Sequence, residues 1–369
     1  MKIGITGSDG FIGKNLLERL SRIKDLEVLT FTKKSSLSDL EFLVRNVSVI
    51  FHLAGVNRSH DDNEFISVNK NLTQIIVGLI EKHKAKTTIV YTSSIHVNKD
   101  DIYGVSKLEG EVILKRYANR SQSKVYIYRL PNIFGKWSRP NYNTVIATWC
   151  YNISRDLPVL VHDKNKRLDL IYIDDLINNF ITHIDKNIES GVLYPEIIPV
   201  YKKKIGDIYD LLISFKDIRS NSLIPSVGSG FSRALYATYL SFLPTNKFIY
   251  NIEVFNDDRG SFYEVIKTQD NGQVSISTTA PGVTRGNHYH NTKNEKFIVI
   301  KGEAIISLRH IYSDERIDHK VSGENLQVVE IIPGYTHCIT NTGDCDMILL
   351  LWSNEIYNQN KSDTYAMEV

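Results

Sequence analysis

Two histidines separated by one residue, His288 and His290, stand in the last third of the sequence, and Glu295 follows them. In a β-strand, side chains two positions apart project from the same face, so both imidazoles would point the same way. A third histidine, His337, lies in a later segment that could form a neighbouring strand. Three imidazoles and one carboxylate suit a divalent transition metal, and we predict zinc, although iron, nickel and manganese accept the same ligands.

The role of this predicted metal is left open by the ligands alone. A metal held by four protein ligands usually stabilises a fold, whereas a catalytic metal keeps an open position. With such a position, the metal could act as a Lewis acid and stabilise an enolate beside a ketone.

A second group of reactive residues lies in the first third of the chain, where Tyr103 and Lys107 are four residues apart. On a helix these positions share a face. A lysine beside the tyrosine, with a nicotinamide cation nearby, would lower the pKa of the phenol, which could then give a proton to a carbonyl oxygen as hydride reaches its carbon. Ser94, rather than Ser93, would hold that carbonyl. We therefore predict that Tyr103, Lys107 and Ser94 are catalytic.

Three glycines near the N-terminus, Gly7, Gly10 and Gly13, separate a strand-like segment from a helix-like segment. A glycine-rich turn lets the backbone approach a pyrophosphate, which then binds the N–H groups at the start of the helix. We predict that these glycines, together with Phe11 and Ile12 between them, bind a dinucleotide cofactor.

The segment after the second predicted strand carries Lys33 and Lys34, with no carboxylate before Asp39. An acidic residue at this place usually binds the ribose hydroxyls of NAD. Two lysines could instead bind the 2′-phosphate of NADPH, so we predict NADPH, with Lys33 as a contact. The alternative is that both lysines are only solvated surface cations.

Apolar strand-like segments alternate with amphipathic helix-like segments through the first half of the chain. This alternation predicts an α/β domain with a Rossmann-like, doubly wound parallel sheet. Beyond residue 245 the helical periodicity fades and short apolar runs are separated by Gly, Asn and Asp, which indicates a β-barrel or double-sheet domain. We predict two domains, residues 1–245 and 246–369.

Composition sets the remaining limits. With 369 residues the chain is longer than one ordinary core, and a net charge of +2 gives no reason to expect nucleic-acid or membrane binding. The sequence has no signal-peptide pattern and no apolar run of about 20 residues. The three cysteines lack CxxC spacing. We expect reduced core thiols rather than a Cys338–Cys345 disulfide, and a cytoplasmic location.

The N-terminal two-thirds resembles the extended short-chain dehydrogenase/reductase superfamily, which acts largely on nucleotide sugars. Besides the glycines and the Ser94–Tyr103–Lys107 set, the match is carried by residues 130–135 and 172–176. By this resemblance Asn132 would lie near the substrate, Arg167 would bind the diphosphate, and Arg129 and residues 136–142 would be further basic candidates. The resemblance also implies cofactor contacts from His52, Leu53, Ala54, Gly55 and Asn69.

The C-terminal part resembles the cupins, which form jelly-roll barrels, through the metal-type residues above and through Gly334, His337 and Asn341. Residues 257–264 and 282–290 are also similar to 4-keto-6-deoxysugar 3,5-epimerases, in which the histidine that corresponds to His288 is a base. A metal ligand is not free to act as a base, so Lys293 and Lys296 are alternative candidates.

As a whole, the chain resembles the bifunctional capsular-polysaccharide enzymes of the UDP-2-acetamido-2,6-dideoxy-L-talose synthase type. That resemblance implies C3 epimerisation of a UDP-4-keto-6-deoxy-N-acetylhexosamine by the cupin, followed by NADPH-dependent C4 reduction, on the way to N-acetyl-L-fucosamine. It also implies a homodimer. Two alternatives stay open: a single-function reductase or epimerase whose cupin only aids assembly, and a non-enzymatic sugar-nucleotide sensor.

Overall fold

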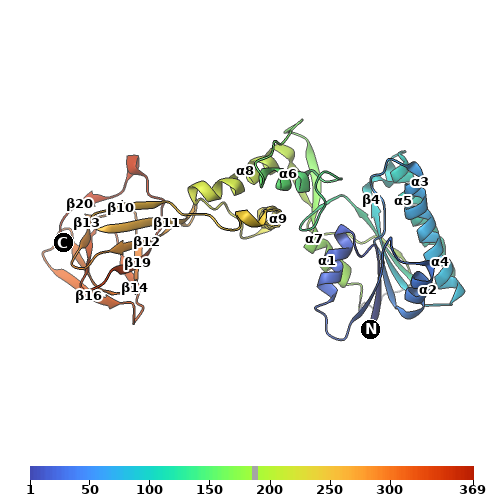
Figure 1. The fold of residues 1–369 in the computed structure, drawn as a ribbon, viewed down its shortest axis with the longest axis horizontal. Helices are drawn as coiled ribbons and strands as arrows, with labels where there is room; N and C mark the ends of the chain where they lie inside the picture. Colours follow the sequence, from blue (N-terminus) through green and yellow to red (C-terminus); the bar gives the residue numbers. More distant parts are fainter. Residues whose placement is uncertain (185–189) are drawn as a thin grey trace. The chain divides into compact units, whose positions relative to one another are not determined.

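The computed structural model describes residues 1–184 and 190–369, which divide into two compact units (Figure 1). The first unit contains residues 1–212 and 230–244, and the second contains residues 213–229 and 245–369. The predicted domain division at residue 245 remains a prediction. It differs from these units in that residues 213–229 belong to the second one.

A parallel sheet forms the centre of the first unit, with its strands in the order β2-β1-β3-β4-β5-β8. The strands are rich in β-branched and aromatic residues, and β3 is buried along its whole length. Their bounds are β1 (Lys2–Thr6), β2 (Glu27–Phe31), β3 (Val49–His52), β4 (Thr88–Ser94), β5 (Lys124–Leu130) and β8 (Gly191–Leu193).

Helices cover both faces of this sheet, as Figure 1 shows. On one face, α1 (Phe11–Leu20) and α7 (Ile173–Ile181) form a core with Ile3, Ile5 and Phe51. On the other face, a second core joins Ile50 and Ile89 to α2 (Leu37–Asn46), α4 (Leu72–Lys82) and α5 (Ile102–Ser121). The predicted doubly wound α/β architecture is confirmed.

Shorter elements complete the first unit. A small sheet in the order β6-β7-β9 follows the main one. The remaining elements are α3 (Asp62–Phe65), η1 (Ile66–Asn71), η2 (Ile95–Asn98), β6 (Asn132–Phe134), α6 (Val145–Ile153), β7 (Arg167–Tyr172), β9 (Tyr201–Lys204), α8 (Ile205–Asn221, which continues into the second unit) and α9 (Gly230–Leu240).

Two antiparallel sheets form the second unit, in the orders β10-β11-β12-β19-β14-β17 and β16-β15-β18-β13-β20. Both sheets contribute to one apolar core that includes Val299, Ile306, Ile339 and Leu349, so they pack face to face as expected of a cupin. The strands are β10 (Val254–Asp257), β11 (Gly260–Thr268), β12 (Gly272–Thr279), β13 (Thr284–Tyr289), β14 (Glu295–Lys301), β15 (Glu303–His310), β16 (Arg316–Ser322), β17 (Val329–Ile331), β18 (Tyr335–Asn341), β19 (Met347–Ser353) and β20 (Tyr365–Ala366), with short helices η3 (Thr245–Lys247) and η4 (Gln359–Lys361).

The cysteines were expected to be reduced thiols in the protein core. All three cysteines are free, and Cys150 and Cys338 are buried as expected. The expectation of a core thiol is wrong for Cys345, which is exposed because it lies in the connection between β18 and β19.

Among the described residues, no helix combines the length and apolarity that crossing a bilayer requires.

Candidate active site and metal centre

A cleft of about 1230 Å³ opens at the carboxyl ends of the parallel strands of the first unit. Gly7, Leu53, Ser94 and Leu130, each at or just beyond the end of a different strand, line it. This edge is where open α/β sheets bind nucleotides. The predicted cofactor residues that line the cleft are Gly7, Gly10, Phe11, Ile12, Gly13, Lys33, Leu53, Ala54 and Gly55.

The glycine turn is shaped by close backbone contacts. Gly7 has a positive φ of 73°, and a Cβ atom there would lie 2.7 Å from the backbone of Ala54. A Cβ atom on Gly13 would lie 2.2 Å from the carbonyl oxygen of Gly7. Only glycine fits these positions, and α1 therefore begins directly beneath the cleft, where its free N–H groups suit a phosphate.

His52 and Asn69 lie behind the cleft and do not line it. The ring of His52 lies between the hydroxyls of Thr6 and Thr73, at 2.7 and 2.9 Å, and burial, with Lys107 nearby, lowers the pKa of His52 to about 3. Asn69 accepts from the N–H of Val56 and donates to its carbonyl, both at 2.9 Å. His52 thus holds two hydroxyls and Asn69 holds the backbone of Val56, a supporting role that a sequence motif cannot distinguish from contact with the cofactor.

Ser94, Tyr103 and Lys107 all line the same cleft. Ser94 ends β4 and caps η2 by accepting a hydrogen bond from the N–H of His96. Asp101 caps α5 by accepting from the N–H of Gly104 at 2.7 Å, one residue after Tyr103. A strand end and a capped helix start thus bring the three predicted catalytic residues together.

Burial shifts the pKa values of both Tyr103 and Lys107. Burial lowers the pKa of Lys107 to about 8, and its ammonium donates to the carbonyl oxygen of Thr92 at 2.9 Å. The pKa of Tyr103 is raised by burial, although a hydrogen bond with Ser94 opposes the rise. The ammonium of Lys107 is directed at the backbone of β4. The lowering of the Tyr103 pKa, expected with a nicotinamide cation beside the phenol, stays a prediction.

A buried carboxylate that the sequence did not predict, that of Glu111, lies beside this group. Glu111 accepts hydrogen bonds from the hydroxyl of Ser93 at 2.6 Å and from the hydroxyl of Tyr194 at 3.1 Å. Arg129 binds both of its oxygens, at 2.9 and 2.7 Å. Arg129, a basic candidate for the substrate, is therefore engaged with Glu111 and does not line the cleft. The spacing of Lys107 and Glu111 on one helix was the available signal.

Of the two lysines after β2, only Lys33 lines the cleft. Its ammonium forms an ion pair with Glu64 at 2.9 Å, and the Ser59 hydroxyl donates to the same carboxylate at 2.7 Å. The hydrogen bonds from Ser59 and Lys33 lower the pKa of Glu64. Lys34 is exposed outside the cleft, so the pair does not act as a unit.

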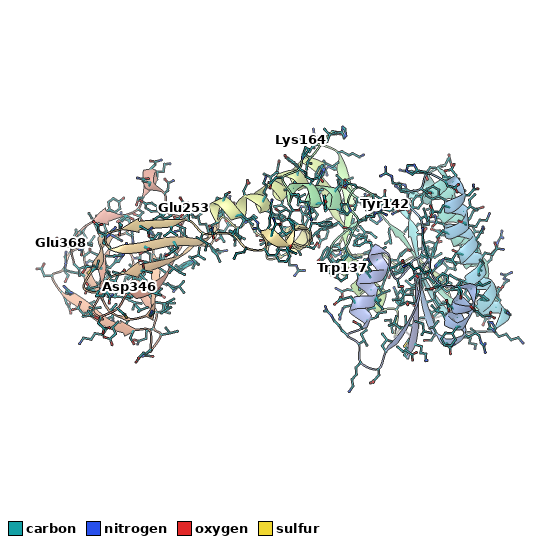
Figure 2. All side chains as sticks on the ribbon, viewed as in Figure 1. Trp137, Tyr142, Lys164, Glu253, Asp346 and Glu368 are labelled. Atoms are coloured by element: carbon teal, nitrogen blue, oxygen red, sulfur yellow. The ribbon has the colours of Figure 1, made fainter. Side chains whose placement is uncertain are left out.

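The predicted substrate residues separate in the structure. Asn132 lines the cleft, whereas Arg167 lies on β7, paired with Lys204 of β9, and does not. Trp137 and Tyr142, labelled in Figure 2, line the cleft together with Arg139. The guanidinium of Arg58 donates to the carbonyl of Tyr142, and the Tyr142 hydroxyl donates to the carbonyl of Arg58 at 3.1 Å.

In the second unit, His288, His290, Glu295 and His337 meet as predicted, with one ligand atom of each within 4.8 Å of the others. A bulge in β13 produces this geometry. Gly286 has a φ of 106° and Asn287 a φ of 57°, and the register shifts so that His288 pairs with His337 of β18. Glu295 begins β14 in the opposite sheet.

The chemistry of this cluster fits a divalent metal. Nε2 of His290 and both ring nitrogens of His337 are buried and have no hydrogen-bond partner, although both Nε2 atoms lie 3.5 Å from an oxygen of Glu295. Such burial is costly unless a ligand binds these nitrogens. Burial and the two other imidazoles lower the pKa of His288 to about 4, so the ring is neutral at pH 7. Burial acts to raise the pKa of Glu295, but contacts with His290, His337 and Lys293 outweigh it and hold that pKa well below its usual value.

The two lysines considered as bases differ in position. The ammonium of Lys293 lies 2.8 Å from Glu295 and is largely buried. Lys296 follows Glu295 on β14, points to the opposite face and pairs with Glu330. Lys293 alone is therefore next to the metal-type cluster.

Comparison with known proteins agrees with this architecture. The sequence model of the "NAD dependent epimerase/dehydratase family" matches residues 3–194, and that of the "polysaccharide biosynthesis C-terminal domain" matches residues 255–365. The chain belongs to the NAD dependent epimerase/dehydratase family, in a form that carries this second domain, and the predicted resemblance is confirmed.

Within that family, the chain is similar over its whole length to two particular proteins. It is 42% identical over 369 residues to the UDP-2-acetamido-2,6-beta-L-arabino-hexul-4-ose reductase of Pseudomonas aeruginosa, covering 100% of this chain and 99% of that protein. It is 44% identical to the capsular polysaccharide assembling protein CapF of Staphylococcus aureus, with a TM-score of 0.92 and full coverage of both chains. A UDP-glucuronic acid 4-epimerase of Bacillus cereus, 20% identical with a TM-score of 0.56 over 66% of this chain and 96% of its own, shares the fold.

Proposed function

We propose that the first unit reduces the C4 ketone of a UDP-4-keto-6-deoxy-N-acetylhexosamine with NADPH. The observation that carries the proposal is the meeting of Ser94, Tyr103 and Lys107 in the cleft that begins with the glycine turn. The whole-length similarity to a protein named as a reductase of a UDP-linked hexul-4-ose supports the choice of substrate.

Each residue of the cleft would have a separate role in the reduction. NADPH, held by the glycine turn and Lys33, would supply the hydride. Ser94 orients the ketone through a hydrogen bond, Tyr103 gives its phenolic proton to the ketone oxygen, and Lys107 supplies positive charge beside it. Asn132 and residues of the 137–144 segment, which line the cleft, would contact the sugar nucleotide.

The reductase proposal is tested by Tyr103→Phe, which removes the proton donor and keeps the ring. We expect the rate of NADPH oxidation with the UDP-4-keto sugar to fall by roughly 10²- to 10⁴-fold, while NADPH binding is retained. Tyr312→Phe, at an exposed tyrosine of the second unit, is the control. Unchanged turnover in Tyr103→Phe would contradict the role of Tyr103 as proton donor. A wild-type protein that binds the UDP-4-keto sugar without oxidising NADPH would favour the sugar-nucleotide sensor.

For the second unit we propose C3 epimerisation of the same substrate before its reduction, which gives UDP-2-acetamido-2,6-dideoxy-L-talose. The metal-type cluster supports this, because a metal bound to His288, His290, Glu295 and His337 would act as a Lewis acid on the ketone. Lys293, next to the cluster, is our candidate for the proton-transferring base. We also propose that the metal is zinc, that the protein is a homodimer and that it is located in the cytoplasm.

The epimerase proposal is tested with the full chain in deuterated buffer without NADPH. Deuterium should enter C3 of the UDP-4-keto sugar in the wild type and in Tyr103→Phe, but not in Glu295→Ala. No exchange in the wild type would contradict the epimerase. Normal turnover in Glu295→Ala with lowered stability would instead favour the cupin as a structural module.

A further inference from the structure

A short segment that no motif pointed to runs beside the metal-type cluster. Residues 363–368, here called the strap, include β20, which pairs with β13 through His288↔Ala366 and Tyr289↔Tyr365. Figure 1 shows β20 beside β13, and Figure 2 labels Glu368 in the strap. The strap therefore forms the sheet edge next to two of the four predicted ligands.

The backbone of the strap determines the state of one ligand. Nδ1 of His290 lies 2.5 Å from the carbonyl oxygen of Asp363. A carbonyl oxygen only accepts hydrogen bonds, so Nδ1 carries a proton, and in the neutral imidazole Nε2 then keeps its lone pair. Nε2 is the buried nitrogen without a partner, and it lies 3.5 Å from Glu295 within the cluster. The strap thus selects the tautomer that can bind a metal.

The side chain of Asp363 orders the turn between the ligands. Its carboxylate accepts from the backbone N–H groups of Asn291, Thr292 and Lys293, at 3.1, 2.7 and 2.8 Å, and from the Thr292 hydroxyl at 3.0 Å. These residues connect His290, which directly follows β13, to Glu295, which begins β14, so one carboxylate fixes the path between two ligands. All of these bonds except a second contact with Asn291 involve Oδ2.

Further bonds attach the strap to the sheet that carries the ligands. The N–H of Met367 donates to the carbonyl of Asn287 at 3.0 Å, which holds the bulge before His288. The Thr336 hydroxyl, next to His337, donates to the carbonyl of Met367. Arg309 donates to the carbonyl of Glu368 at 2.6 Å. Residues beside three of the ligands are therefore held by the strap.

We propose that the strap, through Asp363, is the positioning element of the metal centre, setting the tautomer of His290 and the approach of Glu295. The inference rests on the proposed function only in requiring that the cluster binds a divalent metal. It makes no assumption about epimerisation, since it concerns how tightly and in what geometry the metal is held.

The test measures metal binding by the full-length protein without substrate. Zinc affinity is obtained by competition with a chromophoric chelator, and ligand geometry from the visible spectrum of the Co²⁺-substituted protein. We expect Asp363→Ala to weaken zinc binding by about 10- to 100-fold and to change the Co²⁺ spectrum. Asp363→Asn, whose amide oxygen can replace Oδ2, should restore affinity to near that of the wild type. Asp344→Ala, at an exposed loop aspartate, is the matched control.

Thr292→Val supplies a milder variant in case Asp363→Ala does not fold, since it removes only the hydroxyl donor to Asp363. It should weaken zinc binding several-fold. Wild-type affinity and Co²⁺ spectrum in both folded variants would overturn the role of the strap while leaving the metal centre intact. A wild-type protein that binds neither Zn²⁺ nor Co²⁺ would overturn the metal centre and the strap proposal together, whereas failed deuterium exchange alone would affect only the epimerase.

Discussion

At the scale of single residues, the buried Glu111 sets the electrostatics around Lys107. The two side chains share one face of α5, and the negative charge of Glu111 raises the pKa of Lys107 against the effect of burial. Burial prevails, so the ammonium of Lys107 loses its proton as the pH rises through about 8. Glu111 thus extends the pH range in which Lys107 is charged.

Replacing Glu111 with glutamine should therefore move the alkaline decline of the reductase to lower pH. Loss of the carboxylate charge lowers the pKa of Lys107 further, and the ammonium is lost earlier as pH rises. The measurement is the pH profile of kcat/KM for NADPH oxidation. Glu109→Gln, on the same helix but paired with Lys70, should leave the decline in place. An alkaline limb that stays fixed or moves upward in Glu111→Gln would refute this role.

Lys33 and Lys34 offer an internal comparison for cofactor preference. Only Lys33 lines the cleft, so Lys33→Ala should raise KM for NADPH by roughly 10-fold, which corresponds to about 1.4 kcal/mol of lost phosphate binding. The same variant should change KM for NADH little. Lys34→Ala should leave both values unchanged. Steady-state kinetics with each cofactor decides the matter, and equal losses for NADPH and NADH would argue against a 2′-phosphate contact.

At the scale of elements, the turn between β1 and α1 depends on glycines for steric reasons. Gly13→Ala would place a Cβ atom 2.2 Å from the carbonyl of Gly7, so the helix would have to move away from the strand. We expect a loss of about 2 kcal/mol or more in stability and weakened cofactor binding. Gly78→Ala, in α4 where a Cβ atom meets nothing within 4 Å, should stabilise the protein by about 0.5–1 kcal/mol.

Thermal unfolding of the two variants, followed with NADPH fluorescence titrations, checks this prediction. A helix-propensity effect alone would make both alanines stabilising. If close packing at Gly13 determines the shape of the turn, Gly13→Ala must lower the stability and Gly78→Ala must raise it.

The elements of the first unit could be predicted because strands buried on both faces read as continuous apolar runs, and the helices between them keep their own period. The Ser94–Tyr103–Lys107 group and the four metal-type residues also follow from local spacing. Spacing could not reveal the bulge at Gly286 and Asn287, which depends on register with β18. It could not reveal Asp363, which contacts a turn about seventy residues earlier in the chain, nor the fact that His52 and Asn69 support the cleft from behind.

At the scale of the whole molecule, the cleft and the metal-type cluster lie in different compact units. Each unit has its own core, so removal of a metal from the second unit should not disturb cofactor binding in the first. The buried imidazoles and the carboxylate of Glu295 would lose their ligand, and the second unit would lose the binding free energy of the metal.

Chelation should therefore lower the unfolding temperature of the second unit and leave that of the first unit unchanged. At metal concentrations about 100-fold above Kd, the stabilisation is about 2.7 kcal/mol, which corresponds to a shift of roughly 5–10 °C in a unit of this size. Calorimetry with and without chelator gives the shift, and NADPH titration gives the control. Loss of NADPH affinity on chelation, or a single transition that shifts as a whole, would contradict the independence of the two units.

The chain passes between its compact units after residues 212, 229 and 244, so the second unit is interleaved with the first and is not simply joined to its end. Residues 213–229 belong to the second unit, where Ser222 and Ile224 form backbone hydrogen bonds with Lys267, both of 2.8 Å. For protein engineering, no single cut yields both units whole. A split at residue 245 would deprive the barrel of this segment and leave the reductase with an unpaired extension. Exchange of barrels between relatives would succeed better by transplanting residues 213–229 together with residues 245–369.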